Sequence, residues 1–404
     1  MGKNAMRGPL SGIKVLDLTL FQNGPFGTLI LGDLGADVIK VEDPVNGDPG
    51  RKLTTKPHPQ GQTLYFEAMN RNKRAMTLDL KKPEGKQIFY HMVKTVDVVV
   101  QNYRHGVADR LGIDYETLAQ YNPKIICASV TGFGRKGPDA ERGLMDILGQ
   151  ARSGAMKAMV FPDEPLEYQG SFGLADQTGA IALALSIMAA LLARERLGIG
   201  QDVEVSQLGA QMMLQHYGIS WFLATGEPPV RIRRTQARNA LFNIYQCQDK
   251  KWIALSCIQS DRYWHDFCRV AHLENIEHEE RLKDHATRRD HGPELVAILD
   301  PVFMEKPREE WLRLLNEFDI MCTPVNDYAD LLTDPQVLAN DYIVEVDHPG
   351  GGKMRQVNNP IRLSATPAQI RCTAPEFGQH TEEVLLEFGY AWKQIEAFRT
   401  LGAI

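Results

Sequence analysis

The sequence predicts an α/β protein built on a parallel sheet, and two observations support that prediction. In the first half of the chain, short runs of apolar residues alternate with segments of helical periodicity. The apolar runs are continuous, which is typical of strands that are buried on both faces by helices. Ligands of such sheets bind beyond the carboxyl ends of the strands, so we expect the functional site there.

The expected elements follow in order. In the first half, strands are expected at 13–18, 37–41, 76–80, 97–100 and 124–130, with helices at 24–34 and 83–94. Two long helices should flank a short strand at 202–205 within residues 174–225. After a Gly/Pro break at 226–229 we expect a strand pair (241–246 and 251–257), charged helices to about 318, turns or linkers at 334–335 and 347–352, and a last helix at 381–395.

Composition restricts the partners of this chain. Its 404 residues include 45 Lys and Arg against 51 Asp and Glu, so no basic excess is available to neutralise nucleic acid. The longest apolar run, 180–193, is shorter than the ~20 residues of a membrane span and indicates a buried core helix. Residues 1–6 lack the apolar stretch of a signal peptide. We therefore expect a cytoplasmic protein with neither a membrane nor a nucleic-acid partner.

The surrounding sequence argues against both a metal site and a dinucleotide-binding motif. The six cysteines form no CxxC pair, and the histidines between 265 and 291 lack metal-ligand spacing, so no metal is expected. Residues 132–137 match GxGxxG after a strand. However, no apolar helix follows, and no acidic residue ends a strand ~20 residues further on. A mobile glycine-rich loop is the better interpretation, which speaks against a nicotinamide-dependent oxidoreductase.

Asp176 stands at the start of a long apolar helix and permits two interpretations. It can cap the helix N-terminus, a place that Asp favours. Alternatively, it is a carboxylate that backbone N–H groups and the helix dipole keep ionised, ready to attack an acyl group. Small neighbours, Gly173, Ala175 and Gly179, leave room for a substrate.

A set of short motifs then occurs in one order along nearly the whole chain. They lie at 22–25 (QNGP), 35–42 (GADVIKVE), 47–51 (GDPGR), 70–74, 78–85, 99–106, 132–134, 146–154, 174–176 and 198–201. Together they resemble CoA-transferase family III, the formyl-CoA transferase and carnitine CoA-transferase type. The resemblance is densest from about Leu10 to Ser206.

The resemblance implies a domain organisation that the pattern alone does not give. A Rossmann-like large domain is formed from both chain ends, a small α+β domain is inserted, and two protomers interlock as rings in a homodimer. The implied boundaries are 1–205 for the first part of the large domain, 206–228 for a helical linker, 229–330 for the small domain, 331–350 for a return linker and 351–404 for the part that completes the large domain.

The resemblance also implies the chemistry. CoA passes from an acyl-CoA donor to a small free carboxylic acid, through a mixed anhydride and a thioester on Asp176, and Gln22 stabilises the developing oxyanion. CoA and acyl-CoA are substrates, and no cofactor stays bound. The positions that match the CoA-lining residues of the family are Asn23, Leu78, Lys81, Asn102, Tyr103, Arg104, Arg110, Arg142 and Met145.

Two departures bear on the choice of reaction. The acyl-CoA racemases of the same fold need an acid/base pair, with His before the Asp of a GHDIN-like motif and Glu in a small-domain loop. Met145 and Gln259 stand at those places, which disfavours the racemase alternative. That loop, 256–260, also lacks the glycine run of formyl-CoA transferases. We therefore expect an acid other than the oxalate/formate pair, with succinyl-CoA or acetyl-CoA as donor. A CoA-binding protein without turnover would not need Asp176.

Overall fold

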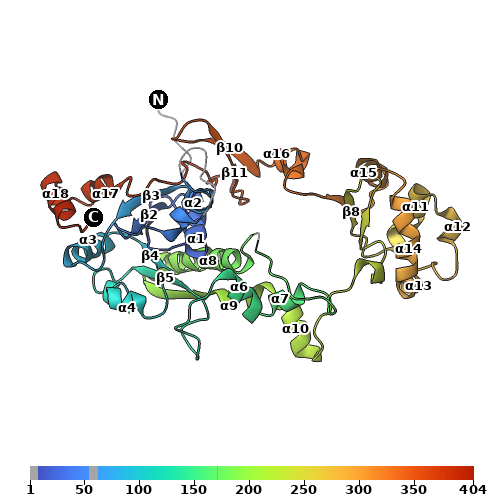
Figure 1. Cartoon of the computed structure of the whole chain (residues 1–404), viewed down its shortest axis with the longest axis horizontal. Coiled ribbons are helices and arrows are strands. Elements are labelled where there is room, and N and C mark those ends of the chain that lie inside the picture. The colour runs from blue at the N-terminus through green and yellow to red at the C-terminus, as the bar shows by residue number, and fades with distance from the viewer. Residues whose placement is uncertain (1–7, 54–61, 171) are drawn as a thin grey trace. The chain divides into compact units, whose positions relative to one another are not determined.

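The structure is a computed structural model that describes residues 8–53, 62–170 and 172–404 (Figure 1). Residues 1–6, on which the signal-peptide expectation depends, lie outside the described residues. The chain divides into two compact units. The first comprises Met1–Ala158, Leu166–Pro229 and Asp341–Ile404, and the second comprises Met159–Pro165 and Val230–Asn340.

The first unit is built on a six-stranded sheet in the order β3-β2-β1-β4-β5-β6, with every neighbouring pair parallel. The strands are β1 (Lys14–Asp17), β2 (Asp37–Glu42), β3 (Lys73–Thr77), β4 (Val98–Gln101), β5 (Ile126–Thr131) and β6 (Gln201–Ser206). This order is that of doubly wound dinucleotide-binding folds. The predicted α/β class with a parallel, Rossmann-like sheet is confirmed.

Helices cover both faces of this sheet (Figure 1). One face packs on α3 (Pro83–Val93), α17 (Thr381–Glu387) and α18 (Trp392–Thr400) through Phe89, Leu385 and Ile395. The other face packs on α1 (Asn23–Asp33) and α8 (Leu174–Leu197) through Leu31, Leu183 and Ile187. The C-terminal helices α17 and α18 thus complete a layer that α3, from the first quarter of the chain, begins.

The remaining elements of this unit are short. They are the 3-10 helix η1 (Pro49–Lys52), α2 (Leu64–Asn70), α4 (Val107–Leu111), α5 (Tyr115–Leu118), α6 (Asp146–Arg152), α7 (Ala155–Ala158), α9 (Gln207–Leu214), α10 (His216–Thr225) and the hairpin of β10 (Ile343–Asp347) and β11 (Lys353–Val357).

Helix α8 is long and apolar enough to cross a membrane by length and composition. One side of it is buried against the sheet, so α8 is a core helix, as the sequence predicted.

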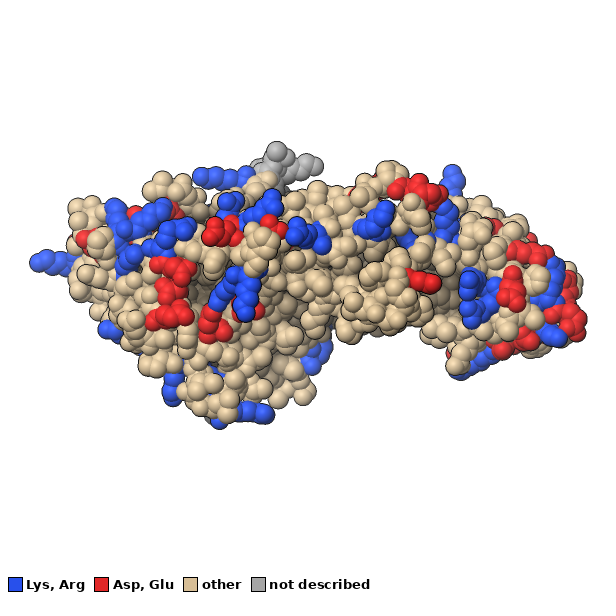
Figure 2. All heavy atoms as spheres, turned by 90° about the horizontal axis from the view of Figure 1, so that it is seen from below, with Lys and Arg blue, Asp and Glu red and all other residues tan. Residues whose placement is uncertain are grey.

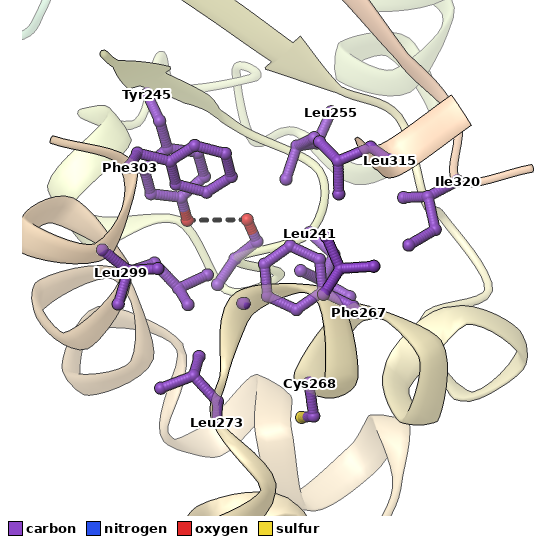
Figure 3. Close-up of a cluster of buried hydrophobic side chains, with 14 of the residues drawn as sticks. Leu241, Tyr245, Leu255, Phe267, Cys268, Leu273, Leu299, Phe303, Leu315 and Ile320 are labelled. Carbon is purple, nitrogen blue, oxygen red and sulfur yellow. Dashed lines mark hydrogen bonds between the residues drawn. The ribbon is translucent and has the colours of Figure 1, made fainter. Parts of the chain in front are cut away.

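The second unit joins an antiparallel sheet to a helical layer. Its strands pair in the order β7 (Ile244–Gln246), β8 (Trp252–Leu255), β9 (Cys322–Val325). Figure 3 shows its core, in which Tyr245 stacks on Phe303 at 4.5 Å and donates a hydrogen bond to the Ala240 carbonyl at 2.7 Å. The other elements are η2 (Arg234–Gln236), α11 (Asp261–Ala271), α12 (Glu274–Glu277), α13 (His285–Asp290), α14 (Gly292–Phe303), α15 (Arg308–Asn316), η3 (Asp330–Leu332) and α16 (Pro335–Ala339).

Several expected elements were wrong in detail. The expected strand 76–80 is β3 at Lys73–Thr77, because buried Lys73 hid the strand start and the chain turns at Asp79. The expected last helix is two helices, since Gly389 adopts φ 87° between them. The helix after β6 is likewise broken, at Gln215.

The expected turn at 334–335 instead starts helix α16, where Asp334 accepts the N–H groups of Gln336 and Val337. Strands β9, β10 and β11 were not predicted.

Candidate active site

Asp176 lies in the first turn of α8, at the edge of the cavity described below. The N-cap of this helix is Gly173, with φ 59°, so Asp176 is the third helical residue and the N-cap interpretation was wrong. A side chain at Gly173 would collide with the Gln22 amide, whose Nε2 occupies the space of a Cβ. Glycine therefore permits both the left-handed turn and the approach of Gln22 to the helix end.

Asp146 provides the cap that Gly173 lacks. Its Oδ1 accepts the backbone N–H groups of Ala175 at 2.6 Å and Asp176 at 3.1 Å. Its Oδ2 accepts hydrogen bonds from Gln150 Nε2 at 2.7 Å and from the Tyr168 hydroxyl at 2.8 Å. A buried carboxylate with four donors is fixed in place, so Asp146 sets the start of α8 and the position of Asp176.

The Asp176 carboxyl is surrounded by opposing influences. Burial, and then the charge of Asp146, raise the pKa of Asp176 from 3.8 to about 6, while a hydrogen bond from Gln207 Nε2 to its Oδ1 lowers it. The helix end was expected to favour the ionised form of Asp176. The pKa is instead raised, because desolvation outweighs the local hydrogen-bond donors. At neutral pH the group is still mainly a carboxylate, and it is poorly solvated, which favours nucleophilic attack.

A cavity of about 530 Å³ opens at Asp176, beyond the carboxyl ends of β1, β4 and β5. Its position agrees with the edge of the sheet that the sequence indicated. Eight residues singled out from the sequence line this one cavity: Gln22, Asn23, Asn102, Tyr103, Arg104, Arg142, Met145 and Asp176.

The remaining three site candidates lie elsewhere. Leu78 and Lys81 line a neighbouring cavity of about 330 Å³, which shares Tyr103 with the first. Exposed Lys81 contacts Asp43 at 3.1 Å. Arg110 lies on α4 beside Gly106, outside the residues that line these two cavities.

Some of the candidate side chains are already engaged. Asn102 accepts the N–H of Leu20 and donates to its carbonyl, both at 2.8 Å, so its carboxamide fixes the loop that leads to Gln22. Arg142 pairs with Asp139 at 2.9 Å.

A buried ionic network lies beneath that loop. Asp48 accepts the N–H of Phe21 at 3.0 Å and pairs with Lys40 at 2.8 Å, and both side chains are fully buried. Phe21 adopts φ 64°, a strained conformation for a residue with a side chain. The network holds this turn and thereby the direction of Gln22.

Residues that sequence reasoning missed also line the cavity. Tyr65 is one, and burial together with the charges of Asp176 and Asp48 raises the pKa of its hydroxyl. Gln207 is another, placed by the first turn of α9 after β6. Neither belongs to a local motif, because the fold brings each to Asp176 from a distant segment. Asp146 was noted within a motif but was not assigned to the site.

The residues 132–137 form no dinucleotide-binding turn. They lie in an irregular segment between β5 and α6, and Gly132 lines the Asp176 cavity.

Among the described residues there is no group of three or more His, Cys, Asp or Glu side chains that could hold a metal ion. In the view of Figure 2, basic and acidic side chains are interspersed.

Comparison with known proteins gives one consistent result. Residues 10–381 match the profile of CoA-transferase family III. The acetyl-CoA:oxalate CoA-transferase of Acetobacter aceti is 37% identical over 359 residues, which cover 89% of this chain and 90% of that protein. The formyl-CoA:oxalate CoA-transferase of Rhodopseudomonas palustris is 33% identical over 99% of this chain and 98% of its own length.

The solved structures give the same assignment. A CAIB/BAIF family protein from Brucella suis superposes with a TM-score of 0.84 at 28% identity, covering 95% of this chain and all of that one (100%). The resemblance stated from the sequence motifs is thus confirmed. The chain belongs to CoA-transferase family III and is a CoA-transferase.

Proposed function

We propose that Asp176 is the nucleophile that carries CoA from an acyl-CoA donor to a free carboxylic acid. The observation that carries this proposal is the place of Asp176, a poorly solvated carboxylate in a cavity that the carboxamide residues Gln22 and Gln207 also line. Carboxamides can donate hydrogen bonds to an oxyanion without transferring a proton to it or to the nucleophile.

The transfer has four steps. An Oδ of Asp176 attacks the acyl carbon, the C–S bond breaks, and CoA leaves as thiolate, which gives a mixed anhydride. The thiolate attacks the Asp176 carbonyl carbon, and the donor acid leaves as carboxylate. The acceptor carboxylate attacks the resulting aspartyl-CoA thioester and releases thiolate. The thiolate then attacks the acceptor acyl carbon and regenerates the Asp176 carboxylate. Each step exchanges one bond for another, and no proton or electron enters.

The surrounding residues support each step. Gln22, held by its strained turn, donates to the oxyanion that forms at the acyl or aspartyl carbon. Gln207 orients the carboxylate oxygen that it contacts. The anhydride must be kept from water, because hydrolysis would waste the activated acyl group.

CoA binding is assigned to the cations and to the neighbouring cavity. Arg104, Arg110, Arg142 and Lys81 suit the phosphates on charge grounds, since guanidinium and ammonium groups bind phosphate oxygens. Leu78, Tyr103 and Met145 give the less polar contacts, and Asn102 holds the loop at Leu20 that borders the site. Met145 also bears on the racemase alternative, because its thioether in the cavity cannot serve as acid or base.

The relatives extend the candidate substrates. The names of two relatives specify oxalate as acceptor, with acetyl-CoA or formyl-CoA as donor. The 256–260 loop of this chain lacks the glycine run expected for the formyl-CoA type. Acetyl-CoA and succinyl-CoA are therefore the first donors to test, with oxalate included among the acids.

Intact-protein mass spectrometry tests the mechanism. The enzyme is mixed with acetyl-CoA, succinyl-CoA or formyl-CoA and then treated with hydroxylamine, which converts an anhydride or thioester of Asp176 to a hydroxamate. A mass change on wild type that is absent from Asp176→Ala supports the covalent route. Wild-type turnover by folded Asp176→Ala would overturn it. Exchange of the α-proton of an acyl-CoA with deuterium, without transfer, would favour the racemase alternative.

We also propose that this cytoplasmic enzyme works as a homodimer whose protomers interlock. Exposed apolar side chains support a second copy as the partner. Ile181, Leu185 and Leu192 form an outward stripe on α8, and α10 exposes Trp221 and Leu223. Because α8 packs one side on the sheet as a core helix, an apolar surface of this kind fits a permanent interface. Native mass spectrometry at nanomolar concentration should show a dimer, and a monomer would contradict the proposal.

A further inference from the structure

Asn23 is a buried polar residue that has no partner within residues 8–53, 62–170 and 172–404. It is the first residue of α1 and is 5% exposed. Neither its Nδ2 nor its Oδ1 has a hydrogen-bond partner among these described residues, although both atoms are buried. A buried amide left unpaired costs about 1–3 kcal/mol, so such a group in a cavity wall is most simply explained by a ligand that completes it.

The carboxamide lies beside the nucleophile. Its Nδ2 occupies the space where a Cβ of Gly179 would stand, and Gln207 Cγ is 3.2 Å from the same point. Gly179 follows Asp176 by three residues on α8, so the two positions are neighbours on one helix face, about 5–6 Å apart at Cβ. Asn23 and Gln207 therefore converge on the turn that carries Asp176, and glycine at 179 makes room for them.

This position restricts what Asn23 can contact. An acyl group bonded to Asp176 has its C2 atom one bond beyond the acyl carbon. A substituent on C2 therefore lies two bonds from the acyl carbon, within reach of a side chain one helical turn away. The CoA phosphates need cations, which the same cavity offers at Arg104 and Arg142 rather than beside Gly179.

We propose that Asn23 selects carboxylic acids that carry an oxygen atom on C2. Its carboxamide donates to that oxygen, or accepts from it when it belongs to a hydroxyl group. The class includes 2-hydroxy acids, 2-oxo acids and oxalate, whose second carboxyl group supplies the C2 oxygens. An acid with a plain alkyl C2 leaves the amide unpaired and binds less well. The inference rests on the proposed transferase function and adds the chemistry of its acceptor.

Matched acids of equal size test this selection. The kcat/KM of wild type is measured for glycolate against propionate, and for lactate against isobutyrate, with acetyl-CoA and succinyl-CoA as donors. The kcat/KM values for oxalate and glyoxylate, compared with that for glycolate, show whether a carboxyl, an oxo or a hydroxyl oxygen on C2 is preferred. We expect the oxygenated member of each pair to be favoured by about 10- to 100-fold, the value of one buried hydrogen bond.

Two variants assign the preference to Asn23. Asn23→Leu has nearly the same shape without the amide, and Asn23→Ala removes the side chain. Both should reduce the preference to less than about threefold while still using propionate. Gln120→Ala, at an exposed position on the first unit, is the control and should keep the wild-type preference.

The possible failures are distinguishable. Equal use of glycolate and propionate by wild type overturns the inference, leaves the transferase function intact, and needs no variant to fold. A rise in KM for every acyl-CoA in Asn23→Leu, with the acid preference unchanged, overturns it in favour of a CoA contact. No transfer to any acid with any donor overturns the proposed function, and this inference with it.

Discussion

The carboxylate of Asp146 accepts the backbone N–H of Asp176 at 3.1 Å, so one acid fixes the position of the other. The two acids have different environments. Asp146 has four donors, whereas Asp176 faces the cavity with Gln207 on one oxygen. The negative charge of Asp146 also opposes ionisation of Asp176. The helix start is therefore stabilised by the same group that makes its third residue harder to ionise.

The first prediction concerns the pH dependence of transfer. Because the nucleophile must be ionised and its pKa is raised to about 6, kcat/KM should fall with unit slope below about pH 6. Gln207→Leu should move the midpoint up, since it removes a donor to the charged form, and Asp146→Asn should move it down. Gln120→Ala is the control. A midpoint near 4 in wild type, or shifts of the opposite sign, would refute this account of Asp176.

The second prediction is that Asp176→Asn stabilises the fold at neutral pH. Folding raises this pKa from 3.8 to about 6, so the folded chain holds the proton more tightly than the unfolded chain between these values. Stability therefore falls as pH rises through this window, and wild type carries the full cost above pH 6. Urea unfolding should show an advantage of Asp176→Asn that is about 1 kcal/mol larger at pH 8 than at pH 5. An advantage independent of pH would contradict the burial of this charge.

The third prediction compares two lysine–aspartate pairs. Lys73 and Asp17 pair at 2.9 Å and are fully buried, whereas the Lys81 that pairs with Asp43 is 70% exposed. Burial would raise the pKa of Asp17, but the charges of Lys73 and Lys40 outweigh it and keep this carboxyl ionised. Lys73→Met leaves the buried Asp17 carboxylate without its paired lysine. The substitution should lower the free energy of unfolding by about 3–5 kcal/mol. Lys81→Met should cost less than about 1 kcal/mol by the same measurement. A loss of less than about 1 kcal/mol for Lys73→Met as well would show that the buried pair is not needed for stability.

The fourth prediction concerns CoA binding. Millimolar CoA should raise the melting temperature, because it binds the native state only. Arg104→Ala removes a cation that lines the Asp176 cavity and should weaken the Kd for CoA about tenfold, the value of a charge-assisted hydrogen bond. Lys124→Ala, an exposed cation elsewhere on the unit, is the matched control. The same shift in Arg104→Ala and wild type would remove Arg104 from the binding site.

Sequence reasoning reached the parallel sheet and its site edge because buried strands such as β4 and β5 are continuous apolar runs. It missed the start of β3, since Lys73 looks like a surface residue until Asp17 is seen beside it. Pattern alone could not show that α17 and α18 cover the first sheet, because that contact joins the two ends of the chain. The family resemblance supplied that arrangement.

The site shows the same division. Residues next to each other in a motif, such as Gln22 and Asn23, could be marked together, and both line the cavity. Tyr65 and Gln207 come from segments 142 residues apart, and only the fold places both at Asp176. The raised pKa of Asp176 was equally out of reach, because burial is a property of the folded chain.

The insertion of the second unit has a consequence for biosynthesis. Arg71 and Asp33 pair at 2.7 Å in the first unit, and their neighbours Val357 and Asn359 come from the last quarter of the chain. Asn72 likewise binds the backbone of Gln369 and Cys372. A ribosome therefore releases all of Val230–Asn340 before these partners exist. The inserted unit can fold first, while its host still lacks the hydrogen-bond partners that Val357 and Asn359 give to Arg71 and Asp33, so the nascent host should be the part that chaperones protect.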